Sequence, residues 1–380
     1  MNKVTPISFY IVKVHSRCNL DCVYCYEYNL GNDGWKYKPK LMSIETFTTL
    51  CQRINEHAIA SNLKDVYISF HGGEPLLRTP EFFDEAMILA RKIIDADIEV
   101  KFGLQTNATL MNEKFLKVFL DHGLRAGTSI DGPELINDAR RITHGGAGSY
   151  KETLRGIEYF LSDTGKKAWG GILAVIDVES DPIEVYNHLA ALDPPCIDFL
   201  EPDGHWDKLP PGKSGIESTE YGDWLIALFD YWFSGDQQID FRRFEEIIEL
   251  LLGGAGKAEY FGVESVALIT IATDGSYEPV DQIKSVENGI ENLGLNVFDH
   301  ELDLVLKHPL IKDRTIGMEA LSEKCRSCEF VLSCGAGYYP HRFDKVNRFR
   351  NPTIYCSDYL KLFRHIQKSL DIELTDATCP

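Results

Sequence analysis

Three cysteines near the N-terminus have the spacing of a metal-binding loop. Cys18, Cys22 and Cys25 form the pattern C-x3-C-x2-C directly after an apolar run at residues 7–14. Three thiolates on one loop can bind a single [4Fe–4S] cluster and leave its fourth iron open. An open metal position is typical of a catalytic site, whereas a closed one is typical of a structural site. A zinc knuckle, with His15 as the nearest further donor, is the alternative interpretation.

Four further cysteines lie in the C-terminal part of the chain. Cys325, Cys328 and Cys334 form C-x2-C-x5-C, and Cys356 follows twenty-two residues later. Four thiolates complete the coordination of a [4Fe–4S] cluster or of a zinc ion, so both alternatives stay open on chemistry alone. Three remaining cysteines lack such spacing and are interpreted as core or tail thiols: Cys51, Cys196 and Cys379.

The composition excludes several classes of protein. At 380 residues the chain is long enough for one large domain with an appendage. Its formal net charge of −19 argues against nucleic acid as a partner, because that binding depends on Lys and Arg neutralising phosphates. The sequence has no apolar run long enough to span a membrane, and its N-terminus does not have the pattern of a signal peptide. We therefore expect a cytoplasmic protein whose cysteines bind metals rather than form disulfides.

Strand-like runs alternate with amphipathic helical patterns through the first half. Six strands are predicted, at residues 7–14, 66–70, 99–105, 126–130, 171–176 and 196–200. Helices are predicted between and after them, at residues 43–61, 80–95, 112–122, 150–162 and 181–192. Repeating strand–helix units imply a parallel sheet. Chemical motifs at the strand ends suit a partial barrel of the TIM type, although a doubly wound sheet explains the pattern almost equally well.

The pattern changes after Glu201. Two helices are predicted at residues 221–233 and 241–252, followed by a hairpin formed by residues 265–272 and 276–280 around the turn at Asp274-Gly275. A final amphipathic helix is predicted near residues 359–370.

The motifs together resemble the radical S-adenosylmethionine (SAM) enzymes. The cysteine triad, with Tyr24 just before its last member, is followed by Gly72-Gly73-Glu74-Pro75 after the second predicted strand. The resemblance implies an α/β fold with a partial (β/α)6 core, here residues 1–215, and one [4Fe–4S] cluster whose open iron chelates the methionine end of SAM. Reductive cleavage of SAM would then give a 5′-deoxyadenosyl radical that abstracts a hydrogen atom from the substrate.

The resemblance also implies which residues contact SAM. These are Tyr24, Gly72, Gly73, Glu74, Asn107, Ser129, Arg141 and Leu200. Two adjacent glycines let a ligand approach the main chain closely, and the guanidinium of Arg141 can grip a carboxylate with two hydrogen bonds. Turn formation, capping and core packing are the alternative roles for these residues, and Arg140 competes with Arg141.

The second cysteine set resembles the SPASM extension of radical SAM peptide maturases. We assign this extension to residues 301–380, and residues 216–300 to a helical bridge and β-hairpin. The resemblance implies an auxiliary [4Fe–4S] cluster bound by Cys325, Cys328, Cys334 and Cys356. SPASM domains often carry a second, inner cluster, but Val280 and Tyr338 stand where its cysteines are expected. The sequence therefore predicts one auxiliary cluster.

Several further segments resemble FxsB-type maturases, which are close to the enzymes that form three-residue cyclophanes on ribosomal peptides. They are residues 224–232, 244–248, 273–281 and 351–356. The resemblance implies a ribosomal precursor peptide as substrate, in which an aromatic ring carbon is joined to an unactivated β-carbon two residues away. It also implies an external electron donor of the ferredoxin or flavodoxin type.

Loss of a proton from the substrate requires a base, for which the resemblance implies Asp281, because Glu278-Pro-Val-Asp281 lies where related maturases carry a catalytic aspartate. Burial in a water-poor pocket is expected to raise the pKa of its carboxyl group toward neutrality. Turn formation is the alternative role for Asp281, and the weaker candidates for the base are Glu278, His205, Asp207, His341 and Arg342. The competing functions are another radical SAM peptide modification, namely an ether or thioether crosslink, epimerisation or formylglycine formation, and a non-catalytic iron–sulfur or zinc protein.

Overall fold

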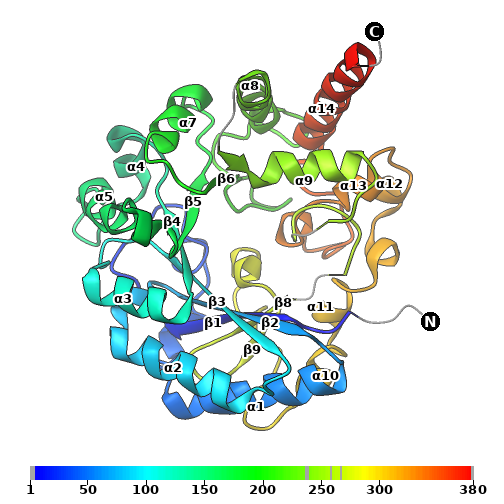
Figure 1. Ribbon diagram of the computed structural model, residues 1–380. Coiled ribbons are helices and arrows are strands. Elements are labelled where there is room, and N and C mark those ends of the chain that lie inside the picture. Colours follow the sequence, from blue (N-terminus) through cyan, green and yellow to red (C-terminus); the bar gives the residue numbers. More distant parts are fainter. Residues whose placement is uncertain (1–4, 236–238, 257–258, 266–267, 378–380) are drawn as a thin grey trace.

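A computed structural model describes residues 5–235, 239–256, 259–265 and 268–377 (Figure 1). A nine-stranded sheet forms the centre, with the spatial order β7-β6-β5-β4-β3-β2-β1-β8-β9. Its strands are β1 (Phe9–His15), β2 (Asp65–Gly72), β3 (Glu99–Thr106), β4 (Arg125–Ser129), β5 (Trp169–Val175), β6 (Cys196–Leu200), β7 (Asp240–Phe241), β8 (Leu268–Ile271) and β9 (Tyr277–Glu278). Strands β1 to β7 pair in parallel with their neighbours in chain order.

Helices follow the parallel strands and cover the outside of the sheet (Figure 1). In the first half they are α1 (Ile44–Ala60), α2 (Pro80–Ile93), α3 (Glu113–His122), α4 (Glu134–Arg140), α5 (Tyr150–Ile157), α6 (Asp163–Lys166) and α7 (Pro182–Ala190). Several begin at residues whose side chains accept hydrogen bonds from the first free N–H groups, as Ser43, Asn112 and Asp181 do. Their apolar faces pack on the strands in one continuous core. This architecture is the predicted partial (β/α)6 barrel.

The second half adds longer helices and a region of short elements. Helices α8 (Glu220–Ser234) and α14 (Cys356–Ala377) pack together beside α9 (Arg242–Leu251) at one end of the barrel (Figure 1). The short helices of this half are α10 (Leu302–Val305), α11 (Pro309–Lys312), α12 (Glu323–Arg326) and α13 (Val331–Cys334). Six 3-10 turns complete the structure, η1 (Gly34–Tyr37), η2 (Pro75–Leu77), η3 (Glu158–Phe160), η4 (Asp281–Ser285), η5 (Gly317–Ala320) and η6 (Pro340–Arg342).

All six strands expected from the sequence form, and so do the helices expected between them. The predicted hairpin is also confirmed, since β8 pairs with β9 in antiparallel fashion. One feature of this hairpin was not predicted: β8 pairs in parallel with β1 and so extends the main sheet. The division of the chain at residues 215 and 300 stays a prediction, but the hairpin between those limits shares a sheet with the core.

In the part of the chain that the structure describes, no helix combines the length and the apolar character that a membrane span requires. The longest helix, α14, carries charged side chains such as Asp358 and Arg364 along its length.

Candidate active site

The motif residues come together around one cavity of about 230 Å³ at the carboxyl ends of the strands. Each strand from β1 to β6 is followed by, or ends in, residues that line it. Every residue that we assigned to SAM contacts lines this cavity, as do Cys18, Cys22, Cys25 and Asp281. In a parallel α/β sheet this is the edge at which ligands bind, because the loops after all strands meet there.

The cysteine triad lies on the loop after β1. Two N–H groups point at the sulfur of Cys18, the backbone N–H of Leu20 at 3.4 Å and the side-chain amide of Asn107 at 3.8 Å. Burial raises the pKa of Cys18 to about 12 and also raises that of Cys22, which the nearby charge of Arg141 lowers in part. Buried thiols of this kind lose their protons when a metal supplies the positive charge. His15, the possible zinc ligand, instead contacts the carbonyl of Arg17 through its Nδ1 at 2.9 Å.

Glu74 anchors the loop that carries the two glycines. Its carboxylate accepts hydrogen bonds from the hydroxyl of Thr106 at 2.6 Å and from the backbone N–H groups of Asn107 at 2.8 Å and Leu76 at 2.9 Å. The side chain is buried, and these donors occupy both oxygens. Gly72 has a φ of +152°, and a Cβ there would lie 2.2 Å from the carbonyl oxygen of His15. The glycine is therefore required by the close approach of the β1 and β2 loops.

Arg141 reaches the cavity from the end of α4, next to the cysteine loop. Its Nη1 donates to the hydroxyl of Tyr24 at 2.9 Å, and this hydroxyl donates to Asp131 at 2.6 Å. Its Nε is buried and has no hydrogen-bond partner in the structure. Arg140 points elsewhere, since it donates to the carbonyls of Val175 and of Ile176, the latter at 3.0 Å. The sequence left these two arginines in competition, and only Arg141 lines the cavity.

The remaining SAM-contact candidates come from β3, β4 and β6. Asn107 donates to Asn19 at 2.9 Å, which ties the end of β3 to the cysteine loop. Ser129 accepts a hydrogen bond from Gln105 at 2.8 Å, and Leu200 supplies part of the apolar wall.

The residues of this cavity fit SAM and an iron–sulfur cluster. Three thiols face one space, which gives the donor set of a [4Fe–4S] cluster with one open iron. The unpartnered Nε of Arg141 is a buried donor that a carboxylate would satisfy, and SAM carries a carboxylate at its methionine end. No three His, Cys, Asp or Glu side chains meet in a geometry for a single metal ion within residues 5–235, 239–256, 259–265 and 268–377.

Asp281 lies in a buried network of charges on the wall of the same cavity. Its carboxylate forms an ion pair with Lys13, accepts a hydrogen bond from the hydroxyl of Tyr26, and lies 3.2 Å from Nδ1 of His71. Lys13 also pairs with Glu27, which contacts Lys284 at 3.2 Å; Lys284 in turn pairs with Glu278 at 2.8 Å.

The expected direction of the Asp281 pKa shift is wrong. Burial does act to raise the pKa of this carboxyl group, but Lys13, His71 and the more distant Lys284 together lower it well below its usual range. The charge of Lys13 decides the outcome, because it lies in contact with the carboxylate in a buried setting. Asp281 is therefore ionised at neutral pH.

The weaker candidates for the base lie at the edge of the site or outside it. Glu278 is paired with Lys284, and Arg342 donates to the carbonyls of Gly335 and Gly337. His205, Asp207 and His341 do not line the cavity either, but His341 approaches the cavity residue Asp203.

Several polar residues of this site were not predicted, among them Lys13, Tyr26, His71 and Asp203. A buried partner for Lys13 could have been predicted from the sequence. A lysine within the apolar run Ile11-Val12-Lys13-Val14 needs an oppositely charged partner when that run forms a central strand. The other three occupy loop or strand-end positions whose direction depends on the fold.

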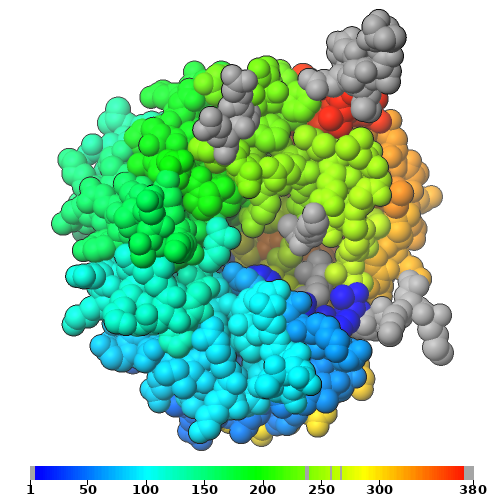
Figure 2. Space-filling view, in the orientation of Figure 1, coloured from blue at the N-terminus to red at the C-terminus, as the bar shows by residue number. Residues whose placement is uncertain are grey.

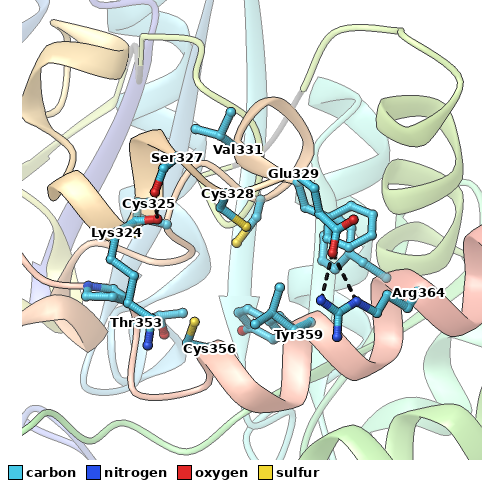
Figure 3. A pocket seen from close by; sticks show the side chains of 16 residues that line it. Lys324, Cys325, Ser327, Cys328, Glu329, Val331, Thr353, Cys356, Tyr359 and Arg364 are labelled. Atoms are coloured by element: carbon cyan, nitrogen blue, oxygen red, sulfur yellow. Dashed lines mark hydrogen bonds and ion pairs between the residues drawn. The ribbon is translucent and has the colours of Figure 1, made fainter.

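The second cysteine set surrounds a separate cavity of about 410 Å³ (Figure 3). Cys325 comes from α12, Cys328 from the turn after it, Cys334 from the end of α13, and Cys356 from the start of α14. Burial raises the pKa of Cys334 to about 12 and that of Cys356 to about 11. Four thiols around one mainly apolar cavity fit an all-thiolate [4Fe–4S] cluster.

Packed apolar and aromatic side chains fill the region where an inner [4Fe–4S] cofactor was considered. Val280 and Tyr338 are buried there with five neighbours: Ile283, Val286, Tyr339, Phe343 and Phe349. Tyr338 also stacks on Tyr260, with ring centroids 4.5 Å apart, and Tyr260 lines the SAM cavity. The two positions considered for ligands of an inner cluster are thus occupied by packed apolar and aromatic side chains.

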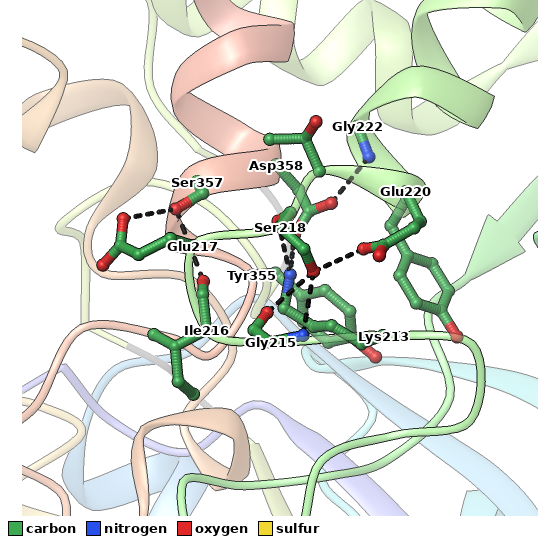
Figure 4. Close-up of polar contacts among 12 residues, drawn as sticks. Lys213, Gly215, Ile216, Glu217, Ser218, Glu220, Gly222, Tyr355, Ser357 and Asp358 are labelled. Atoms are coloured by element: carbon green, nitrogen blue, oxygen red, sulfur yellow. Dashed lines mark hydrogen bonds and ion pairs between the residues drawn. The ribbon is translucent and has the colours of Figure 1, made fainter.

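A buried ion pair fixes the start of α14 beside the fourth cysteine (Figure 4). Lys213 and Asp358 lie 2.6 Å apart, and both side chains have an exposed fraction of 0%. Asp358 also accepts a hydrogen bond from the backbone N–H of Gly222 at 2.8 Å, so that α8, α14 and the loop before α8 meet at one point. Cys356 lies two residues before Asp358 and is positioned by this contact.

Comparison with known proteins identifies the family. Residues 12–189 match the model of the Radical SAM superfamily, and this stretch includes the cysteine triad, the Gly72-Gly73 loop and Arg141. Residues 12–189 are thus a radical SAM region. The chain is accordingly a SAM-dependent enzyme with iron–sulfur cofactors, as the sequence predicted.

Similar proteins match along nearly the whole chain. A cysteine-type anaerobic sulfatase-maturating enzyme of Clostridium perfringens is 24% identical over 366 residues, which cover 95% of this chain and 96% of that protein. A serine-type anaerobic sulfatase-maturating enzyme of Bacteroides thetaiotaomicron is 25% identical over 394 residues, covering 96% and 91%. The solved structure of native anSMEcpe with bound AdoMet and Cp18Cys peptide has a TM-score of 0.82 at 24% identity and covers 98% of this chain and 100% of its own. The fold, including its SPASM-like C-terminal extension, is therefore that of this group.

Proposed function

We propose that this enzyme oxidises a ribosomal precursor peptide by removing two hydrogens from it. The observation that supports this proposal is that three cysteines, the unpartnered Nε of Arg141 and the carboxyl groups of Asp203 and Asp281 share one cavity. When bound, SAM and its cluster supply the radical that abstracts a hydrogen atom. The walls of the cavity exclude water from that step.

The residues of this chain have separate tasks in the proposal. Arg141 grips the carboxylate of SAM through its free Nε, while Tyr24 and Asp131 hold the guanidinium in place. Glu74 keeps the glycine loop closed, so that the main chain contacts the methionine end of SAM. Asp281 and Asp203 are acidic groups on the wall of the same cavity, whereas Glu27 and Glu201 are paired with Lys13 and Arg243.

For the product we propose a crosslink between an aromatic ring carbon and an unactivated β-carbon two residues away, a cyclophane. The support comes from the segments similar to FxsB-type maturases and from the aromatic wall formed by Tyr26 and Tyr260, on which a substrate ring can pack. Because Val280 and Tyr338 belong to a packed apolar cluster, we propose a single auxiliary cluster, bound by the four C-terminal cysteines, as the electron acceptor.

Formylglycine formation is the second candidate. It is supported by the similarity to the sulfatase-maturating enzymes, which extends over at least nine-tenths of both chains. This reaction also removes two hydrogens from one residue, and with a cysteine substrate water then replaces the sulfur, which leaves as hydrogen sulfide. It therefore needs the same cavity and the same proton acceptor. Ether or thioether crosslinking and epimerisation remain outcomes of the test.

The proposal includes partners and a location. A precursor peptide is the substrate, and a ferredoxin- or flavodoxin-type protein delivers the electron that cleaves SAM. Such reductants belong to the cytoplasm, which we propose as the location of the enzyme. The net charge of −19 suits a basic peptide segment better than a nucleic acid.

The test is anaerobic incubation of the reconstituted enzyme with SAM and dithionite, read by mass spectrometry. Two peptides are compared: one encoded beside the gene with an aromatic residue near its C-terminus, and one carrying the cysteine of a sulfatase maturation sequence. The proposal predicts loss of two hydrogens from the first, with fragmentation blocked inside a three-residue ring. Conversion of only the second peptide to the aldehyde would favour formylglycine formation. Unchanged mass with deuterium uptake from heavy water would favour epimerisation and overturn both.

A further inference from the structure

A second carboxyl group of the cavity differs from Asp281 in its surroundings. Asp203 follows β6 and lines the same cavity as the cysteine triad and Asp281. Its side chain is 13% exposed, and its Oδ1 lies 3.6 Å from Nε2 of His341. No lysine or arginine forms an ion pair with Asp203 within the described part of the chain.

The side chain of His341 is buried, and the acidic group that it approaches is the carboxyl group of Asp203. Its ring is held between those of Tyr338 and Tyr355, with centroids 5.2 and 5.0 Å away. Neither ring nitrogen has a hydrogen-bond partner in the structure, although the side chain is fully buried. An imidazole in this position is satisfied by a hydrogen bond to Asp203, which a movement of a few tenths of an ångström would complete.

The two carboxyl groups have opposite electrostatic environments. Asp281 contacts Lys13, Tyr26 and His71, and its pKa is lowered even though burial acts to raise it. Burial raises the pKa of Asp203, and the charge of Asp281 raises it further, while His341 lowers it only in part. Two acidic groups whose environments drive their pKa values apart have different roles in acid–base catalysis.

The other groups that face Asp203 do not supply a compensating charge. They are the phenols of Tyr260, Tyr338 and Tyr355, whose pKa values are all raised, chiefly by burial, and which therefore stay neutral. A base is most effective when its pKa lies near the operating pH, and a carboxylate already neutralised by a contacting lysine binds a proton poorly.

We propose that Asp203, positioned by His341, accepts the proton that the peptide loses, while Asp281 remains ionised as a fixed charge. This inference rests on the proposed oxidation of a peptide. The peptide C–H bond breaks when a hydrogen atom leaves to the SAM-derived radical. The carbon radical left on the peptide then forms the new bond to the aromatic ring. The peptide gives one proton to the Asp203 carboxylate and loses one electron, for which the oxidised auxiliary [4Fe–4S] cluster would be the acceptor when bound. Two hydrogens are thereby removed, and the protonated Asp203 returns its proton to solvent.

The kinetic test compares Asp203→Asn with Asp281→Asn in the reconstituted full-length enzyme. For each variant, 5′-deoxyadenosine and oxidised peptide are measured from pH 5.5 to 9. We expect Asp203→Asn to keep forming 5′-deoxyadenosine while oxidised peptide falls by about 100- to 10,000-fold, the usual contribution of a general base. Asp281→Asn keeps the acidic limb of the pH–rate profile, and His341→Phe shifts that limb.

An unchanged rate and pH profile in Asp203→Asn would overturn the inference alone. Failure of the wild-type enzyme to form 5′-deoxyadenosine or to change the peptide would instead overturn the proposed function. The two failures are thus distinguishable.

Infrared spectroscopy tests the same claim without turnover. In pH-difference spectra of the reconstituted protein labelled with [13C]aspartate, we expect one buried carboxyl band to titrate in the wild type. This band should be present in Asp281→Asn, displaced in His341→Phe and absent from Asp203→Asn. A wild type without the band, or a band that persists in Asp203→Asn, would contradict the assignment.

Discussion

Removal of the buried cation Lys13 is expected to reverse the pH dependence that Asp281 gives to stability. Lys13 contacts both Glu27 and Asp281, and its side chain is only 3% exposed. Breaking a buried ion pair by deleting one partner costs about 3–5 kcal/mol. An unfolding entropy of about 2.1 cal/mol/K per residue gives about 0.8 kcal/mol/K for 380 residues, so the melting temperature of Lys13→Met should fall by about 4–6 °C.

The sign of the pH effect follows from the direction of the pKa shift. In the wild type the pKa of folded Asp281 is lowered, so its stabilisation is present above the usual carboxyl pKa and is lost as the pH falls below it. Without Lys13, burial dominates and raises this pKa above the unfolded value. The stability of Lys13→Met is then highest in acid and declines as the pH rises through the new folded pKa.

The assay is circular dichroism melting of the reconstituted protein between pH 5 and 8, with Lys361→Met as the control. Lys361 pairs with Asp223 at the surface, where the two side chains are 47% and 56% exposed, so its removal leaves no buried carboxylate without a partner. Lys361→Met should change stability little at any pH, whereas Lys13→Met should become less stable relative to the wild type as the pH rises. A loss of stability in Lys13→Met that does not change with pH would refute the claim that Lys13 lowers the pKa of Asp281.

Three further predictions concern the cofactor sites. Arg141→Lys should weaken SAM binding by about 10- to 150-fold in equilibrium dialysis, because a charged hydrogen bond contributes about 1.5–3 kcal/mol. Arg140 donates to strand-end carbonyls, so Arg140→Lys should leave the SAM affinity within about threefold of the wild type. Equal losses in the two variants would contradict the choice of Arg141. Glu74→Gln should lower the melting temperature by about 2–4 °C, since one amide oxygen cannot accept from all three donors, and an unchanged melting curve would contradict its anchoring role. Cys328→Ser should lower the iron content of the reconstituted protein from about eight to about four atoms while the SAM-cleaving cluster keeps its electron paramagnetic resonance signal; full iron retention would contradict the C-terminal site.

The sequence predicted the parts of this molecule that local patterns encode. The six parallel strands, the helices between them and the antiparallel hairpin were readable from periodicity and turn residues, and the cysteine spacing identified both thiol sites. The pairing of β8 with β1 could not be read, because it joins residues more than 250 positions apart. The short helices of the C-terminal part were also missed, since four-residue elements such as α12 carry no periodic signal.

The active-site electrostatics were the least predictable part. Lys13 and Asp281 are separated by most of the chain, so the ion pair that sets the pKa of Asp281 depends on the packing of η4 against β1. The pairing of Asp203 with His341 depends in the same way on the placement of η6. Burial alone predicts a raised carboxyl pKa, and only the identity of the contacting groups decides whether that holds.

Hydrogen transfer from the peptide to SAM is the most direct measurement of the central claim. The precursor peptide is made with deuterium at the β-carbon of the residue to be modified, and the 5′-deoxyadenosine is analysed by mass spectrometry after anaerobic turnover. The account predicts one deuterium in 5′-deoxyadenosine for each peptide that loses two hydrogens. Oxidised peptide accompanied by 5′-deoxyadenosine without deuterium would contradict abstraction from that carbon, and deuterium transfer without oxidation of the peptide would contradict the proposed two-hydrogen loss.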